Sequence, residues 1–258
     1  MRVDIERVEV NLSGRPVLCG VSSHIPAGAS AAIIGMSGAG KTTLLRCVAG
    51  LTRPSAGRVT IDGKSPETFY GQGLLSYLFQ EPYLWSHLTV QQSLELTFRL
   101  LGHTPDANKI DELLHRVGLI NAKSLYPYQL SVGMKARAAI ARAFCVPPRV
   151  LLMDEPFAAI DPLRRLDLNT QVQRLREEYG CTALWATHDV VEALQFATQI
   201  ISIAPPPVGT ATILDLSGMP PIEDNASLPT ESLLLRNHIL GIIKGEMIHD
   251  KEGVPETV

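Results

Sequence analysis

The chain has 258 residues, of which 45% are hydrophobic and 19% are charged, so it is long enough to form one or two domains with a substantial core. Its 23 basic and 26 acidic side chains leave a net charge of −3, which argues against the basic surface that nucleic-acid binding needs. No apolar run approaches the ~18 residues that span a bilayer, and the amino-terminal segment is charged from its start. We therefore expect no nucleic-acid partner and, at most, a peripheral association with a membrane.

The hydrophobic pattern predicts a β-rich amino-terminal segment and then an alternation of short buried strands and helices. The predicted strands are Ala31–Ile34, Arg58–Ile61 with a hairpin turn at Asp62-Gly63, Leu75–Phe79, Val150–Met153, Thr182–Ala186 and Ile200–Ile203. Helical spacing between them predicts helices over Thr43–Ala49 and Leu163–Tyr179. Strands that alternate with helices imply a mostly parallel sheet, so the predicted fold class is α/β.

Two segments depart from this alternation. Residues from about 86 to 146 have helical patterning over Val90–Leu101, Asn108–Val117 and Met134–Phe144, which predicts a helical subdomain inserted in the α/β core. The last segment, 205–258, begins with a proline-rich linker and continues into one predicted helix. That helix has a Thr230 cap and the apolar residues Leu233, Leu234, Ile239, Leu240 and Ile243. The predicted organisation is therefore a domain over residues 1–204 and a tail over 205–258.

A phosphate-binding loop follows the strand Ala31–Ile34. It reads Gly35-Met36-Ser37-Gly38-Ala39-Gly40-Lys41-Thr42, a complete GxxxxGK[ST] motif. The glycines let successive backbone N–H groups point at one phosphate. The following helix begins at Thr43, also a predicted nucleotide contact, and presents its positive amino end. Lys41 is predicted to reach the β- and γ-phosphates, and the Thr42 hydroxyl is predicted to hold Mg²⁺. The sequence thus predicts a nucleotide site that uses ATP and Mg²⁺.

Two carboxylates end the apolar strand Val150–Met153. Asp154 stands where a Walker B aspartate meets the Mg²⁺ shell. Glu155 comes one residue later, at a position suited to polarising the attacking water as a general base. Taken alone, such an acidic pair is as compatible with a helix cap before Pro156 as with catalysis. Together with the phosphate loop upstream, it favours catalysis.

Further short motifs occur in a fixed order along the chain. They are Phe79-Gln80 at a strand end, Leu130-Ser131-Val132-Gly133-Met134 before a helix, Ala158-Ala159-Ile160-Asp161, and Thr187-His188-Asp189 at another strand end. In this order the set resembles the nucleotide-binding subunit of an ATP-binding cassette (ABC) transporter, and the resemblance covers residues 1 to about 204. It implies a RecA-like P-loop core, an antiparallel β-subdomain near the amino terminus, and the helical subdomain at about 86–146.

The resemblance also implies roles for these residues and partners for the chain. Gln80 is then a catalytic and metal-binding glutamine, His188 the switch histidine, Ser131 and Gly133 nucleotide contacts of the signature, and Asp161 part of the D-loop. Two cassettes would pair head to tail, a homodimer being favoured and a heterodimer remaining open. The dimer would lie on the cytoplasmic side of the membrane, in contact with permease subunits. A periplasmic or extracellular binding protein would deliver solute to those permease subunits.

A narrower resemblance concerns the kind of transporter. The strings YPYQLSVGMKARAAIARAF and LLMDEPFAAID, with THDVVEALQFA, are similar to those of bacterial nitrate, sulfonate and taurine importers. In that group the signature commonly reads YPxQLSGGMxQR. This resemblance predicts that the transporter is an importer and that its solute is a small molecule.

The sequence departs from the family at three positions. Val10-Asn11-Leu12-Ser13 stands where an aromatic residue usually stacks on adenine, so the ring is missing. Val132 replaces the first glycine of the signature, and a β-branched residue there adds bulk and excludes positive φ. Ala136 replaces a glutamine that is common beside the signature. We expect these changes to weaken the nucleotide sites without abolishing the chemistry.

Two other classes of function remain open from the residues alone. One is a soluble cassette ATPase that is not coupled to transport, although the chain lacks the long heptad insertion and the tandem cassette found in such proteins. The other is a P-loop kinase that phosphorylates a small molecule. A kinase would leave the signature and His188 without a role.

Overall fold

The computed structural model describes residues 1–217, 239 and 241. The predicted carboxy-terminal helix, with Leu233, Leu234, Leu240 and Ile243, falls outside these residues. Ile239 alone of its apolar positions is described, and it is fully buried in the core.

Nine strands form two sheets in the described residues. Their bounds are β1 Val3–Leu12, β2 Arg15–Ile25, β3 Ser30–Ile34, β4 Ala56–Ile61, β5 Leu75–Leu78, β6 Val150–Asp154, β7 Thr182–Thr187, β8 Gln199–Ile203 and β9 Ala211–Asp215. The smaller sheet has the order β2-β1-β4 and is antiparallel, and the core sheet has the order β5-β6-β7-β3-β8-β9. The core sheet is parallel except for its edge strand β9.

The helices lie between these strands in the chain. They are α1 Lys41–Val48, α2 Val90–Leu100, α3 Ala107–Arg116, α4 Val132–Ala143, α5 Pro162–Glu178 and α6 Val190–Phe196, with short 3₁₀ helices at Pro66–Phe69, Ile120–Ala122 and Pro127–Gln129. Local capping explains the start of α2, because Thr89 and Gln92 form a reciprocal capping box.

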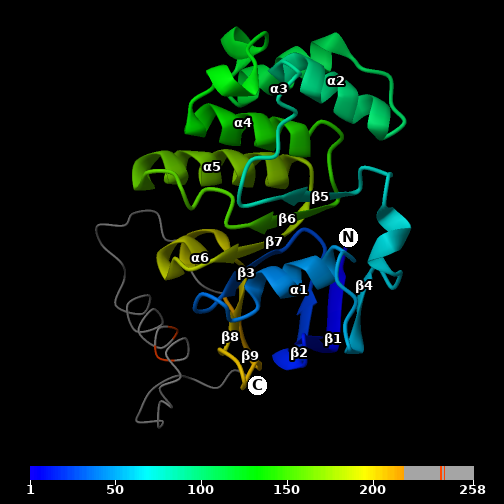
Figure 1. The fold of residues 1–258 in the computed structure, drawn as a ribbon, viewed down its shortest axis with the longest axis vertical. Coiled ribbons are helices and arrows are strands. Elements are labelled where there is room, and N and C mark those ends of the chain that lie inside the picture. The colour runs from blue at the N-terminus through cyan, green and yellow to red at the C-terminus, as the bar shows by residue number, and fades with distance from the viewer. Residues whose placement is uncertain (218–238, 240, 242–258) are drawn as a thin grey trace.

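Figure 1 shows α2, α3 and α4 gathered at one end of the molecule and the antiparallel sheet at the other. The α/β class, the antiparallel β-subdomain and the helical insertion are thus confirmed.

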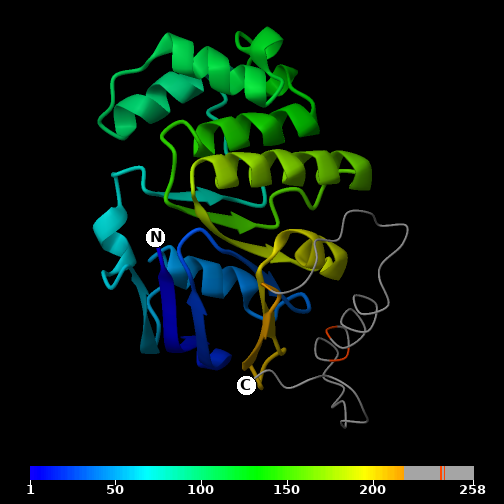
Figure 2. The same ribbon diagram turned by 180° about the vertical axis from the view of Figure 1, so that it is seen from behind.

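Burial explains why the core strands are short apolar runs. Every residue of β3, β6 and β7 is buried, as expected for parallel strands covered on both faces. Helix α1 contacts both sheets and fills the space between them, whereas α4, α5 and α6 pack on the other face in a second apolar cluster. Figure 2 shows the same layers from behind. The two clusters hold the carboxyl ends of the core strands in fixed positions.

Two details of the chain differ from the sequence prediction. Residues 211–215, expected to lie in a linker, form β9 and pair antiparallel with β8, so the core sheet continues past residue 204. At Asp62-Gly63 the predicted turn is present, with φ of 47° and 75°, but no second strand follows it. The returning chain makes only an isolated bridge, between Ile61 and Lys64.

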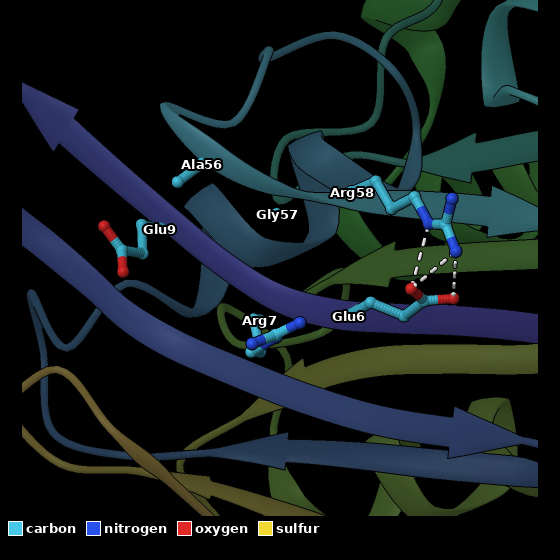
Figure 3. A pocket seen from close by; sticks show the side chains of 6 residues that line it. All are labelled: Glu6, Arg7, Glu9, Ala56, Gly57 and Arg58. Atoms are coloured by element: carbon cyan, nitrogen blue, oxygen red, sulfur yellow. Dashed lines mark hydrogen bonds and ion pairs between the residues drawn. The ribbon is translucent and has the colours of Figure 1, made fainter.

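An irregular pairing of β1 with β4 produces a shallow hollow on the antiparallel sheet. The register shifts between Glu6 and Glu9, and Arg7 has a positive φ of 45°. A Cβ at Gly57 would collide with the Arg7 carbonyl oxygen, so only glycine permits this approach. Figure 3 shows the hollow beside the ion pair between Arg58 Nη2 and Glu6 Oε2, 2.8 Å apart. Strand geometry therefore accounts for this hollow.

Candidate functional site

The order of three neighbouring strands assembles the candidate site. β6, β7 and β3 lie side by side and parallel, so their carboxyl ends meet at one edge of the core sheet. Asp154 ends β6 and Glu155 follows it, His188 follows β7, and Lys41 begins the helix after β3. Segments more than 100 residues apart in the chain thus converge at the point where open α/β sheets bind their ligands.

The phosphate-binding loop has the strained backbone that its glycines predict. Gly38 and Gly40 have φ of 79° and 103°, a region that disfavours residues with a Cβ. A Cβ on Gly40 would also lie 2.8 Å from Leu18 Cδ2, and one on Gly35 would lie 2.7 Å from the Ile203 carbonyl oxygen. Steric exclusion at three positions therefore shapes the loop that precedes α1.

Lys41 is a buried cation held at the centre of the site. Its residue is only 7% exposed, and its Nζ donates to the carbonyl oxygens of Gly35 at 3.0 Å and Met36 at 3.3 Å. The same Nζ lies 3.3 Å from Glu155 Oε1. These acceptors balance the charge of a cation that burial would otherwise penalise.

The two residues predicted to bind Mg²⁺ from the loop and from β6 are in direct contact. Thr42 Oγ1 donates to Asp154 Oδ1 at 2.8 Å, and the Tyr77 hydroxyl donates to Asp154 Oδ2 at 3.3 Å. Burial, and next the charge of Asp154, raise the pKa of Tyr77 above its usual range, so the phenol stays a donor. A hydroxyl and one carboxylate fit Mg²⁺, which in phosphate sites takes few protein ligands and completes its shell with phosphate oxygens and water.

Glu155 is held in an unusual conformation beside His188. Its φ is +45°, and its backbone N–H donates to the Ala186 carbonyl oxygen of β7 at 3.2 Å. The side chain is 20% exposed, and its Oε2 lies 3.2 Å from His188 Nδ1. A carboxylate at a strained position between two basic groups is suited to orienting a water molecule.

A pocket of about 550 Å³ contains most of the predicted site residues. Its lining comprises Leu12, Val17, Ser37, Gly38, Gly40, Lys41, Thr42, Thr43, Gln80, Asp154, Glu155 and His188. No aromatic ring is among these described residues. Leu12, at the end of β1 and 48% exposed, lies where the sequence placed the missing ring.

The predicted signature and D-loop residues are not brought to this pocket. Ser131 caps α4, where its Oγ accepts from the Met134 N–H at 3.3 Å. Asp161 caps α5 and accepts from the Arg164 N–H at 3.1 Å. A Cβ added to Gly133 would meet open space. In the described part of the chain, these groups serve as helix caps or face outward.

Val132 introduces no strain within the chain. It is the first residue of α4 and is 56% exposed, so its backbone is helical, as a β-branched residue permits. Its side chain projects from the same helix end as Ser131. Any steric effect of Val132 must therefore fall on a molecule that approaches this end of α4.

Sequence reasoning missed two residues of the site. Val17 lines the pocket from β2, and Tyr77 holds Asp154 from β5. The signal for Tyr77 is a hydroxyl-bearing aromatic residue in a strand that leads to the site, but its partner lies 77 residues away. The register that pairs Tyr77 with Leu152 of β6 determines this contact.

Comparisons with known proteins identify the class to which this fold and site belong. The model of the ABC transporter family matches residues 18–158. The sulfate/thiosulfate import ATP-binding protein CysA of Synechocystis is 35% identical over 204 residues, 78% of this chain and 58% of that protein. The aliphatic sulfonates import ATP-binding protein SsuB of Rhodopseudomonas palustris is 38% identical over 202 residues, 78% of this chain and 70% of that protein.

Solved structures lead to the same class. CbiO1 from Clostridium perfringens, described as part of the ABC transporter complex CbiONQ, superposes with a TM-score of 0.72 at 26% identity and covers 83% of this chain and 88% of its own. A dimeric ATP-binding cassette in a post-hydrolysis state with ADP and Pi gives a TM-score of 0.73 at 27% identity and covers 84% of this chain and all of its own. The chain belongs to the ABC transporter family.

Two further findings concern the length of the chain relative to its relatives and the absence of a membrane-spanning helix among the described residues. It spans less than two thirds of the length of its CysA relatives, 58% in the Synechocystis protein. Within the described residues, no helix combines the length and apolar character needed to cross a bilayer.

Proposed function

We propose that this chain is the ATP-hydrolysing subunit of a bacterial ABC importer and couples ATP binding and hydrolysis to solute uptake through separate permease subunits. The observation that carries the proposal is the convergence of Lys41, the Thr42–Asp154 pair, Glu155 and His188 on one pocket. A structural role alone gives no reason for two basic groups and two carboxylates to share one partly buried edge.

The contacts within the pocket support a division of roles. Lys41 is already within ion-pair distance of Glu155, so a bound γ-phosphate would compete for this cation and free the carboxylate. Glu155 would then orient water, while His188 holds the other carboxylate oxygen or donates to the phosphate. Thr42, Asp154 and Gln80 would hold Mg²⁺, which would supply positive charge to the phosphates.

A second cassette would complete the site. Ser131, Gly133 and Asp161 lie outside the pocket of their own chain, although the family resemblance assigns them to nucleotide binding. In a head-to-tail pair, the positive amino end of α4 and the Ser131 hydroxyl would face the γ-phosphate held by the partner. The related cassette that is solved as a dimer with ADP and Pi supports this arrangement. We favour a homodimer, with a heterodimer as the alternative.

A groove beside Gln80 is suited to a helix of a membrane subunit. Its volume is about 320 Å³, and its lining includes Phe79, Trp85, Leu100 and Arg142. The Arg142 guanidinium lies 5.5 Å from the Trp85 ring, and no carboxylate partner is present among the described residues. An apolar permease helix that carries one acidic residue would match this lining. Such docking would place the cassette at the cytoplasmic face of the membrane.

For the transported solute, we propose the nitrate, sulfonate and taurine class. The string Tyr126-Pro127-Tyr128-Gln129-Leu130 before the signature supports it, as does the SsuB relative. CysA relatives have comparable identity, so sulfate is the competing solute. Uptake of labelled taurine and labelled sulfate by cells with and without the gene separates the two. Loss of sulfate uptake alone would overturn the sulfonate assignment.

The ATPase proposal is tested with the purified chain and with its native complex. We expect Mg²⁺-dependent release of inorganic phosphate from ATP, and copurification of permease subunits after gentle detergent extraction. A kinase would instead release ADP only when a phosphate acceptor is added. ATP hydrolysis without any membrane partner in the extract would favour the alternative of a soluble cassette ATPase.

A further inference from the structure

Glu192 is an acidic residue of α6 that lies behind the catalytic groups without lining their pocket. It follows His188 by four positions and is partly buried. Its Oε2 accepts a hydrogen bond from Thr187 Oγ1 at 3.3 Å. Thr187 is the last residue of β7 and is only 4% exposed. The carboxylate is thus attached to the residue that directly precedes the switch histidine.

When Glu192 is ionised, the hydrogen bonds around Thr187 run in one direction, from the Asp189 N–H through the Thr187 hydroxyl to the Glu192 carboxylate. The Asp189 N–H donates to Thr187 Oγ1 at 3.0 Å, and the Thr187 hydroxyl donates onward to Glu192. An ionised carboxylate only accepts, so it orients the hydroxyl toward itself. A protonated Glu192 would compete as a donor to Thr187 and remove this constraint. The backbone on both sides of His188 is therefore held by the charge state of Glu192.

A cation on α5, Arg165, holds the second loop of the site. Arg165 Nη2 donates to the carbonyl oxygens of Ala158 at 3.4 Å and Ile160 at 3.1 Å, within the loop that runs from Glu155 to Asp161. Its Nε is buried and has no hydrogen-bond partner in the described chain. The positive charge of Arg165 lowers the pKa of Glu192, against the larger effect of burial.

We propose that Glu192 is a positioning residue that fixes the His188 loop through its hydrogen bond with Thr187, and that its charge interacts with Arg165, the cation held by the Glu155–Asp161 loop. It touches neither the nucleotide pocket nor the predicted metal ligands. The expected effect of Glu192 on kcat rests on the proposed ATPase function. The interaction of Glu192 with Thr187 and Arg165 is a property of the folded chain and does not depend on that function.

The charge of Glu192 changes in the physiological range of pH. Burial, and next the negative charge of Asp189, raise the pKa of Glu192 to about 7, whereas the Thr187 hydrogen bond and the positive charges of Arg165 and His188 oppose this rise. These are the titratable and charged groups that act on it from α5 and from the loop after β7. Glu192 is thus protonated below about pH 7 and ionised above it, so the coupled arrangement forms as pH rises.

The kinetic test compares Glu192→Gln with Glu9→Gln, an exposed control on β1. The amide that replaces the Glu192 carboxyl is neutral at every pH, so we expect kcat at pH 8 to fall about 3- to 10-fold and the rise of kcat through pH 7 to flatten. The KM for ATP should stay within about 2-fold, because Glu192 does not line the pocket. An unchanged pH profile, or a loss confined to KM, would overturn the proposal.

A direct titration tests the coupling without any activity. In chain labelled with ¹³C at the glutamate carboxyls, the resonance that is absent in Glu192→Gln should titrate near pH 7. Arg165→Gln removes the opposing positive charge, so it should move this midpoint upward. A midpoint near the ordinary 4.5, or one unaffected by Arg165→Gln, would refute the coupling. A wild-type chain without ATPase activity would refute the proposed function and leave this titration fully informative.

Discussion

The pocket edge of the core sheet and the amino end of α4 hold the two groups of residues predicted to contact nucleotide, and they differ in how their polar groups are satisfied. At the pocket edge, Lys41, Asp154 and Glu155 all contact other predicted site residues. At the end of α4, Ser131 contacts only its own helix, and Val132 and Gly133 face open space. Paired groups in the pocket and an exposed predicted signature are what the proposed composite site, shared between two cassettes, would require of one chain.

The first prediction tests this comparison by trans-complementation. Ser131→Arg places bulk at the end of α4, and Lys41→Ala removes the phosphate-binding cation, so each variant alone should lose ATPase activity. In a head-to-tail homodimer, mixed pairs keep one intact composite site, and random exchange should restore about a quarter of wild-type activity. The measurement is phosphate release after mixing the two purified variants.

The control for that experiment is subunit exchange itself, followed with two differently labelled chains. Exchange without recovered activity would contradict independent composite sites in a homodimer. In a heterodimer, Ser131→Arg would silence only the site built on the partner cassette's phosphate loop.

The second prediction concerns the pocket edge alone. Glu155→Gln removes the general base but keeps the shape of the side chain, so turnover should fall about 10²-fold or more while ATP binding is retained. Lys41→Ala should instead weaken ATP binding, because it removes a charge from the bound phosphates. Single-turnover hydrolysis and nucleotide titration measure both effects. Turnover within a few-fold of wild type would rule out Glu155 as the base.

The third prediction adds the missing ring to the pocket. Stacking of a base on an aromatic ring is worth ~1–3 kcal/mol, so Leu12→Tyr should tighten ATP binding by roughly 5- to 150-fold. Leu12→Met is the matched control, since it keeps an apolar side chain without a ring. Titration of ATP and GTP into each variant checks the effect. Equal affinities for Leu12→Tyr and wild type would mean that Leu12 does not lie over the base.

The fourth and smallest effect is expected at the end of α4. Val132→Gly removes bulk from a surface that would approach the partner's nucleotide, so ATP-driven dimerisation or hydrolysis should rise a few-fold. Val132→Ala serves as a control because it removes most of the bulk and favours the helix more than glycine does. Sedimentation with ATP measures the dimer. No change in either variant would show that Val132 does not limit closure.

The two regions also differ in how well sequence predicts them. The motif from Gly35 to Thr42 determines its own loop, because glycine sterics and the order of strand, loop and helix are local properties. Likewise, Asp154-Glu155 ends a strand that its own apolar run predicts. Strand β9 was not predicted, since its pairing depends on an exposed edge of β8 that no local pattern reveals.

Sequence by itself predicted the class of chemistry and the residue types proposed to carry it, and it determined the order of the core elements. Tertiary structure alone decided that Thr42 meets Asp154 across 112 residues, that Tyr77 supports the same carboxylate, and that Glu192 accepts a hydrogen bond from Thr187. The physical reason is that a strand's neighbours are chosen by packing and register over the whole sheet. A side chain's partners at the sheet edge follow from that choice, and not from the residues next to it in the chain.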